Sequence, residues 1–479
     1  MKDPQRWGGG KYTFKPSLPY VHHSIFYILF QIIRFYLPNL WDKKWGFKLS
    51  KITSLITSIW KNSILILVIL MLISGLVPQL EIFLFGDMVI STIIIKFILV
   101  IILLCSIFFS KAATKIIVAN KLIYIWYLFL LYLVFDLLFL LKNNEFNQLL
   151  IGYNAYYYLI LTIPLFLAVQ NSISIRRISI ILVLLFIPLS ILGICQYLLK
   201  NPILPVSSPN GKFIVKSIDF VNNGSMRAFS LFDSGLAFGN FLCICLSIFW
   251  AYGSTWEKKF ITIPLFILSF IAIYMTLTRN VYLITIFSIL TVSLLEKINS
   301  RNKKFYQSLP FFYLFIGFII NSILSSIKIY SGATLADTTS LLLRQDLWSQ
   351  AFKLWITDVH SFFFGSGIFQ NNNTLDSIVV DNGFLAVILN IGLIGGCIWL
   401  LTIYFAWKFM LNILVLNFNY FNLGLCGFFS TVFISNFFNI NYNVYIIVLI
   451  LYILGKGENR YSIRNYRTES EVQESFSKL

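Results

Sequence analysis

Long apolar runs follow one another along most of the chain, and they restrict its possible folds more than any other feature. Many of these runs reach the roughly 20 residues that a helix needs to cross the ~30 Å hydrocarbon core of a bilayer. Of the 479 residues, 58% are hydrophobic and only 12% are charged. A soluble protein would have to bury several such helices in one core. The sequence therefore predicts an all-α fold, a polytopic transmembrane helical bundle.

The positions of the apolar runs predict the topology of this bundle. They predict about twelve spans, which begin near residues 62, 88, 119, 149, 178, 229, 260, 281, 305, 383, 412 and 439. Lys and Arg gather in the short loops that contain KAATK, SIRR, EKK and EKINSRNKK. The positive-inside rule places these loops, and both termini, in the cytoplasm. We therefore attribute the net charge of +18 to topology and expect no nucleic-acid partner.

This topology divides the chain into five parts. Residues 1–60 form a basic cytoplasmic segment with an interfacial helix, and residues 61–327 form transmembrane helices. Residues 328–382 form a periplasmic or extracellular loop with an amphipathic helix. Residues 383–455 form further transmembrane helices, and residues 456–479 form a cytoplasmic tail.

Three arginines lie on three separate segments that this topology places on the outer side. Arg227 precedes a span, Arg279 lies in the tight turn MTLTRNVYL, and Arg344 lies in the long loop. A charged side chain near hydrocarbon is costly unless it has a partner. The phosphate groups of a lipid-linked substrate are one such partner, because guanidinium groups bind phosphate through paired hydrogen bonds.

Arg344 has an unusual position within its predicted helix. At about 100° per residue, it falls in the middle of an apolar face formed by Leu341, Leu347, Trp348, Ala351, Phe352 and Trp355. An arginine in this position either snorkels toward water or projects its guanidinium into a cavity to hold an anion. The sequence leaves both interpretations open.

Asp381 and His360 are the candidates for a general base on the outer side. Asp381 stands beside Asn382 at the predicted start of a span, where an Asp either takes a proton or caps the helix. His360 follows Asp358 and precedes an aromatic-Gly turn, so it is either a base or a residue that positions the loop. We expect no metal and no other cofactor: Cys243 and Cys245 have no further ligands nearby in sequence, and nucleotide-binding motifs are absent from the sequence.

Four segments together resemble the bacterial O-antigen ligase/polymerase family. They are SMRAFSLFDSGLAFGNFL, TLTRNVYL, RQDLWSQAFKLWITDVHSFFFGSGI and DNGFLAVILNIGLIGG. The second has Arg279 followed by Leu283, and the fourth has Asn382, nine residues, Gly392 and then Gly395. The third resembles the family's His-Pro turn, with Ser361 in place of proline. The resemblance covers roughly residues 60–455.

The resemblance implies a C-type glycosyltransferase-like architecture and an inverting, metal-independent membrane glycosyltransferase. It implies that Arg227, Arg279 and Arg344 bind diphosphate, with Arg279 and Arg344 also catalytic. Asp381 would orient or deprotonate the acceptor, and His360 and Asn382 would contribute to substrate binding. Ligases carry histidine at the position of Asp381, so the Asp-Asn pair is more similar to the polymerase branch.

The sequence thus predicts a polymerase of lipid-linked polysaccharide repeat units, of the O-antigen or exopolysaccharide kind. It would transfer the growing glycan from polyprenyl diphosphate to the terminal sugar of a new lipid-linked unit. The alternatives are a ligase that transfers glycan to a lipid core or protein, and a lipid-linked oligosaccharide flippase. We expect a location in the bacterial inner membrane with the active site on the periplasmic or extracellular side. The expected partners are the polyprenyl-diphosphate-linked oligosaccharide, membrane lipids and a chain-length regulator protein.

Overall fold

The fold comes from a computed structural model of the chain. It describes residues 63–73, 75–86, 98–103, 121–141, 174–206, 221–222, 225–253, 259–298, 301–327, 348–353, 355–356, 359–365, 382–438 and 442–455. The chain divides into two compact units, Met1–Ile59 and Trp60–Leu479, and every described residue belongs to the second. The predicted interfacial helix, the cytoplasmic tail, Arg344 and Asp381 lie outside the described residues.

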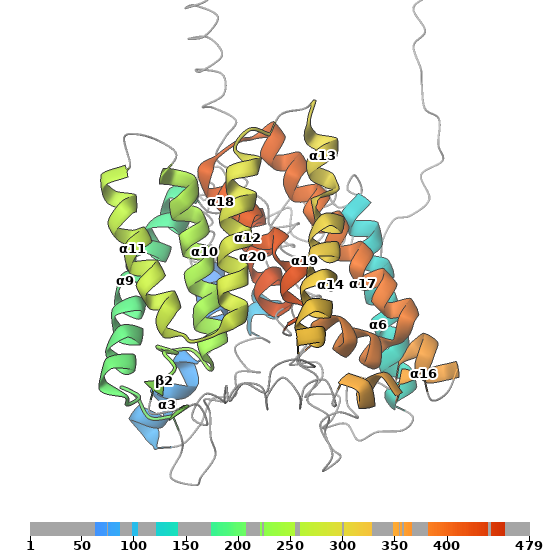
Figure 1. The fold of residues 1–479 in the computed structure, drawn as a ribbon, viewed down its shortest axis with the longest axis horizontal. Helices are drawn as coiled ribbons and strands as arrows, with labels where there is room; N and C mark the ends of the chain where they lie inside the picture. Colours follow the sequence, from blue (N-terminus) through green and yellow to red (C-terminus); the bar gives the residue numbers. More distant parts are fainter. Residues whose placement is uncertain are drawn as a thin grey trace, which may run out of the picture. The chain divides into compact units, whose positions relative to one another are not determined.

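The described part of the chain is helical, apart from loops and one small strand pair (Figure 1). The two strands, β1 (Val221–Asn222) and β2 (Ser225–Met226), pair antiparallel. The helices are α3 (Leu76–Phe85), α6 (Lys121–Leu141), α9 (Ile175–Leu199), α10 (Gly235–Gly253), α11 (Lys259–Met275), α12 (Arg279–Leu295), α13 (Lys303–Gln307), α14 (Leu309–Ile327), α16 (Val359–Phe364), α17 (Gly383–Leu416), α18 (Tyr420–Ser430), α19 (Val432–Ser435) and α20 (Tyr442–Leu454).

Three helices within the described residues, α9, α10 and α17, are long and apolar enough to cross a membrane. The helix Ser63–Leu72 and α3 pass the same test when taken together, but they are bent by 89° and form either a broken span or a re-entrant loop. Shorter apolar helices accompany them, and large apolar side chains such as Phe260, Phe315 and Phe318 are exposed. Exposed apolar surface on this scale is typical of protein that contacts lipid. The predicted membrane association is thus supported, while the twelve-span bundle stays a prediction.

One predicted span begins later than expected. The sequence places a span start near residue 412, but α17 continues to Leu416 and α18 begins at Tyr420. The break depends on asparagines rather than on charges. Asn417 ends α17, and the Asn419 side chain accepts a hydrogen bond of 2.7 Å from the backbone N–H of Asn422, which caps α18.

α10 packs against α9, α11, α12 and α18 (Figure 1). Glycines allow the closest approaches: Gly239 packs against the Val281 side chain, and Gly424 of α18 packs against the backbone of Ile248. Small residues at helix contacts are typical of membrane proteins, where close packing replaces the hydrophobic effect as the driving force.

A buried hydroxyl network joins the helices around α18. Thr291 Oγ1 lies 2.6 Å from Tyr313 Oη and 2.8 Å from Ser430 Oγ, which links α12, α14 and α18. Tyr445 Oη of α20 lies 2.6 Å from Ser435 Oγ of α19. Such bonds satisfy polar groups that would otherwise be costly in an apolar interior.

Candidate functional site

The segments that carry Arg227 and Arg279 lie against each other. The backbone N–H of Ala228 donates a hydrogen bond of 3.0 Å to the carbonyl of Met275, at the turn between α11 and α12. A Cβ added to Gly235, the first residue of α10, would lie 3.2 Å from the Ala228 carbonyl oxygen and 3.4 Å from that of Thr276. The segment before α10 and the turn before α12 therefore form one packed unit.

The two arginines differ in exposure at this junction. Arg279 is the first residue of α12 and is exposed, whereas Arg227 is half-buried. The Tyr282 hydroxyl, on the first turn of α12, donates a 2.9 Å hydrogen bond to the Tyr274 carbonyl. The shared anion site of Arg227 and Arg279 stays a prediction; the structure brings together the segments that carry them.

A buried glutamine holds the backbone that follows Arg227. Gln196 of α9 is 1% exposed. Its Nε2 donates to the Ser230 carbonyl at 2.9 Å, and its Oε1 accepts from the backbone N–H of Ser230 at 2.7 Å and of Phe229 at 3.3 Å. The Ser230 hydroxyl donates to the Leu189 carbonyl at 2.8 Å. Non-helical backbone in an apolar interior requires such partners, and Ser230 also has a positive φ of 51°.

α3 supports the same loop from another side. The Gln79 side chain is buried, and its Nε2 donates to the Phe232 carbonyl at 3.3 Å. A Cβ added to Gly75, the residue before α3, would lie 2.7 Å from the Asp233 backbone nitrogen. The loop 228–233 is thus held between α3, α9 and the α11–α12 turn.

The turn after α16 lies against a kink in α17. Gly392 interrupts α17 with non-helical angles, φ 67° and ψ −176°. Gly365 has a φ of 82°, and an added Cβ there would lie 2.6 Å from the Gly392 nitrogen. A Cβ on Gly392 would in turn clash with the Phe363 carbonyl. Two of the family-like segments, the His360 turn and the Asn382–Gly395 segment, therefore meet backbone to backbone.

α6 binds the kinked backbone of α17. The Tyr132 hydroxyl donates a hydrogen bond of 2.6 Å to the Ile391 carbonyl. Gly395 provides room for the Tyr132 ring, since an added Cβ would lie 2.6 Å from Tyr132 Cε1. A kink interrupts regular helical hydrogen bonding, so the tyrosine supplies a partner for a carbonyl beside the interruption.

Asn382 caps α17. Its side-chain oxygen accepts from the Leu385 backbone N–H at 3.1 Å, and the next N–H, of Gly383, donates to the Asn436 carbonyl at 2.7 Å. The sequence leaves open whether Asp381 is the cap or a base; the capping residue is Asn382. The Asn382 Oδ1 atom is used in this bond, and its proposed role in substrate binding falls to Nδ2.

His360 lies exposed on the short helix α16, with its ring 5.4 Å from that of Phe364. Residues 348–353 of the same loop are helical, and Ala351 packs with Ala386 and Leu389 of α17. Trp348 and Trp355 pack against this cluster, so these members of the predicted apolar face do contact the protein. Phe352, which was predicted on that face, is instead exposed.

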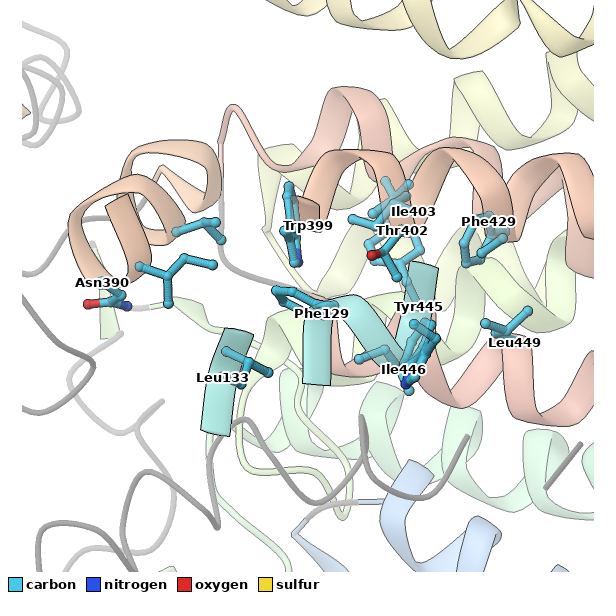
Figure 2. Close-up of a pocket in the computed structure, with 15 residues that line it drawn as sticks. Phe129, Leu133, Asn390, Trp399, Thr402, Ile403, Phe429, Tyr445, Ile446 and Leu449 are labelled. Atoms are coloured by element: carbon cyan, nitrogen blue, oxygen red, sulfur yellow. The ribbon is translucent and has the colours of Figure 1, made fainter. Parts of the chain in front are cut away.

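An apolar cavity lies between α6, α17, α18 and α20 (Figure 2). Figure 2 shows Asn390, from the kinked part of α17, at one end of the cavity and Leu449 of α20 toward the other. Its lining is aliphatic and aromatic except for Asn390 and Thr402, and the aromatic residue Tyr445 adds a hydroxyl group. The cavity therefore suits an apolar chain with few polar groups.

The predicted site residues thus fall into two groups in the described structure. Arg227 and Arg279 share one packed unit, and the His360 turn meets the helix that Asn382 begins. Sequence reasoning missed Gln196, Gln79 and Tyr132; their signal was a polar side chain within an apolar run. Among the described residues, no group of three or more His, Cys, Asp or Glu side chains is placed to hold a metal ion.

No family model matches the chain, and no curated protein sequence matches it. The family resemblance therefore depends on the four sequence segments.

Proposed function

We propose that the protein is a membrane glycosyltransferase that polymerises lipid-linked polysaccharide repeat units. It transfers the growing glycan from polyprenyl diphosphate to the terminal sugar of a new lipid-linked unit. The observation that carries the proposal is the hydrogen bond between Ala228 N–H and the Met275 carbonyl, at 3.0 Å, because it joins the two segments that bear Arg227 and Arg279. Cations from separate segments that meet beside apolar helices suit a diphosphate on a lipid.

The reaction needs two kinds of group. An oxygen of the acceptor hydroxyl attacks the anomeric carbon of the donor, and the bond from that carbon to the diphosphate oxygen breaks. The leaving diphosphate takes the electron pair, and guanidinium groups of Arg227, Arg279 and Arg344 stabilise its growing charge. Asp381 takes the proton of the acceptor hydroxyl. Inversion at the anomeric carbon follows from a single attack opposite the leaving group.

The apolar cavity beside the α17 kink supports a lipid-linked substrate. Its lining offers apolar contact along its length, and the Asn390 amide lies at the end near the kink (Figure 2). Burial of apolar surface favours an isoprenoid chain in such a cavity. His360 and the Asn382 amide, on the segments that meet at this kink, contribute to substrate binding.

The proposal includes a topology. The chain forms a bundle of about twelve spans of the C-type glycosyltransferase kind in the bacterial inner membrane, with the active site on the periplasmic or extracellular side. The C-terminal end of α9, the N-terminal end of α10 and the turn between α11 and α12 meet at one end of the described helices. This arrangement supports a common outward side for Arg227 and Arg279.

The proposal is tested in the host by the chain length of its surface polysaccharide. The Arg279→Ala variant, present at the normal protein level, is expected to give short chains or single repeat units. Arg176→Ala is the matched control, because Arg176 is exposed at the other end of α9 and is expected to leave chain length unchanged. Normal long chains with Arg279→Ala would overturn the assignment.

A strain that lacks the gene separates polymerisation from flipping. Without a polymerase, single repeat units accumulate on the outer side of the membrane; without a flippase, they stay on the inner side. If the deletion strain retains its lipid-linked units on the inner side, the proposed function changes from polymerase to flippase.

A further inference from the structure

Asn240 and Asn280 are buried asparagines near the N-terminal ends of α10 and α12. Their exposed fractions are 1% and 6%. In each of them both Nδ2 and Oδ1 are buried and have no hydrogen-bond partner within the part of the chain that the structure describes. A buried polar group without a partner destabilises a fold. Two whole amides of this kind in one region leave hydrogen-bonding capacity that a ligand could use.

α10 and α12 run in the same direction and pack closely. Gly239 packs against Val281, and Trp250 Nε1 donates to Ser293 Oγ at 2.9 Å. Residue numbers rise together along the two helices between these contacts, so the helices are parallel. Their N-terminal ends therefore lie at the same end of the pair (Figure 1).

The two amides project to the same side of this helix pair. Asn240 follows Gly239, and Asn280 precedes Val281, at the point where the helices touch. One residue turns a helix by about 100°. Asn240 is one residue after the contact on α10, and Asn280 is one residue before the contact on α12. Because the two helices are parallel and face each other, these opposite rotations turn both side chains toward the same side of the pair.

The contacts of α18 with the two helices at Ile248 and Thr291 lie further along the helices than the two amides. Gly424 of α18 packs against Ile248, which lies about 12 Å beyond Asn240 along α10. Ser430 Oγ lies 2.8 Å from Thr291 Oγ1, and Thr291 lies about 16 Å beyond Asn280 along α12. The amides thus lie beyond the end of these α18 contacts.

The same end of the helix pair carries the arginines of the proposed diphosphate site. Asn280 directly follows Arg279. The start of α10 packs against the α11–α12 turn and against the carbonyl of Ala228, the residue after Arg227. The donor sugar attached to that diphosphate, and the acceptor sugar that attacks its anomeric carbon, would be within the same region.

From these placements we infer that Asn240 and Asn280 bind hydroxyl groups of the acceptor sugar. This inference depends on the proposed polymerase function and extends it to the residues that select the acceptor. An asparagine amide both donates and accepts hydrogen bonds, as does a sugar hydroxyl. Neighbouring packed helices lie about 8–10 Å apart, a spacing that one sugar ring with hydroxyls on both edges can bridge.

The test uses the full-length protein in lipid nanodiscs and lipid-linked repeat units isolated from a deletion strain of the host. Long-chain donor is held saturating and the single-unit acceptor is varied. Asn240→Leu and Asn280→Leu are each expected to raise the KM for the acceptor about threefold to tenfold, the loss of one or two hydrogen bonds. The thermal unfolding midpoint is expected to stay or rise, because leucine removes an unpaired buried amide.

Asn422→Leu is the matched control. Asn422 of α18 is 0% exposed and both of its amide atoms also have no partner in the described residues, but Asn422 lies beside Gly455 at the other end of α18. This variant is expected to leave the acceptor KM unchanged. Asn240→Ala and Asn280→Ala repeat the measurement with a smaller side chain. If a leucine variant fails to fold, the alanine variant at the same position decides the outcome.

The outcomes separate the two proposals. Lengthening by the wild type, with an unchanged acceptor KM in the Asn240 and Asn280 variants, overturns this inference and leaves the polymerase intact. An equal rise in KM for Asn422→Leu also overturns it, since the effect would then come from packing alone. No lengthening by the wild type overturns the polymerase and this inference with it.

Discussion

Gln196 and Ser230 are joined by two hydrogen bonds, one donated by the Ser230 backbone N–H at 2.7 Å and one accepted by the Ser230 carbonyl at 2.9 Å. Ser230 lies three residues after Arg227, in a loop. The Gln196 side chain of α9 gives its backbone the hydrogen-bond partners that a helix or strand would otherwise supply. The loop in turn bonds to the turn that precedes Arg279. The position of the segment that carries Arg227, relative to the segment that carries Arg279, therefore depends on this glutamine.

Gln196→Leu should destabilise the protein. It leaves the Ser230 N–H and carbonyl and the Phe229 N–H without their buried partner, at a cost of about 2 kcal/mol or more. We expect a lower thermal unfolding midpoint in detergent and loss of long glycan chains. Leu198→Ala is the control, because Leu198 is 65% exposed on the same helix. Equal unfolding midpoints for the two variants would contradict the role of Gln196.

Gly392→Ala should disrupt the contact between α16 and α17. The added Cβ clashes with the Phe363 carbonyl, and the combination of φ 67° and ψ −176° belongs to a backbone region that is essentially restricted to glycine and costs an alanine about 1–3 kcal/mol. Gly86→Ala gives a milder case without a clash: Gly86 is left-handed, with φ 76° and ψ −12°, and an added Cβ has nothing within 4 Å. Gly86→Ala should lower the unfolding midpoint slightly, and Gly392→Ala much more. A similar small decrease for both would mean that the α16 turn does not lie against the kink.

Tyr132→Phe should weaken the support of the α17 kink. It removes the 2.6 Å bond to the Ile391 carbonyl, which we expect to cost about 1 kcal/mol. The thermal unfolding midpoint should fall by a few degrees, while Tyr127→Phe, at a half-exposed position of the same helix, should leave it unchanged. An unchanged midpoint with Tyr132→Phe would show that the carbonyl does not depend on this hydroxyl.

Asn382→Asp separates capping from substrate binding. The carboxylate keeps an oxygen for the Leu385 N–H, and acidic residues favour helix N-termini, so the unfolding midpoint should hold. The variant loses the two donors of Nδ2, so the rate of chain lengthening should fall. Asn382→Ala should lose both, with a cap worth about 0.5–2 kcal/mol. Wild-type lengthening by Asn382→Asp would restrict Asn382 to capping.

The sequence predicted the helices well where apolar runs end at charged loops. The predicted starts near 178, 260 and 281 agree closely with α9, α11 and α12. It failed where polar but uncharged residues lie near a helix end: α17 continues through Lys408 and Asn412 to Leu416, and the break falls at Asn417 and Asn419.

The site was predictable only in part, because the residues that form its contacts lie far apart in the chain. Arg227 and Arg279 stand out in sequence as cations beside predicted spans, but the packing of their segments depends on the bond between Ala228 and Met275, which lie far apart in the chain. The glycines at 365, 392 and 395 formed a recognisable spacing, whereas the close backbone approach that requires them appears only in three dimensions. Gln196 stands out in sequence as a polar residue within an apolar run, but its partners cannot be found there, because they lie more than 30 residues away.

The most direct test of the polymerase assignment uses the purified protein with lipid-linked repeat units as its only glycan. A polymerase is expected to convert them into a ladder of longer lipid-linked chains with release of polyprenyl diphosphate, and Arg279→Ala is expected to abolish the ladder. A wild-type protein that leaves the single units unchanged, but transfers them once a lipid core or protein acceptor is added, would contradict the assignment and identify a ligase.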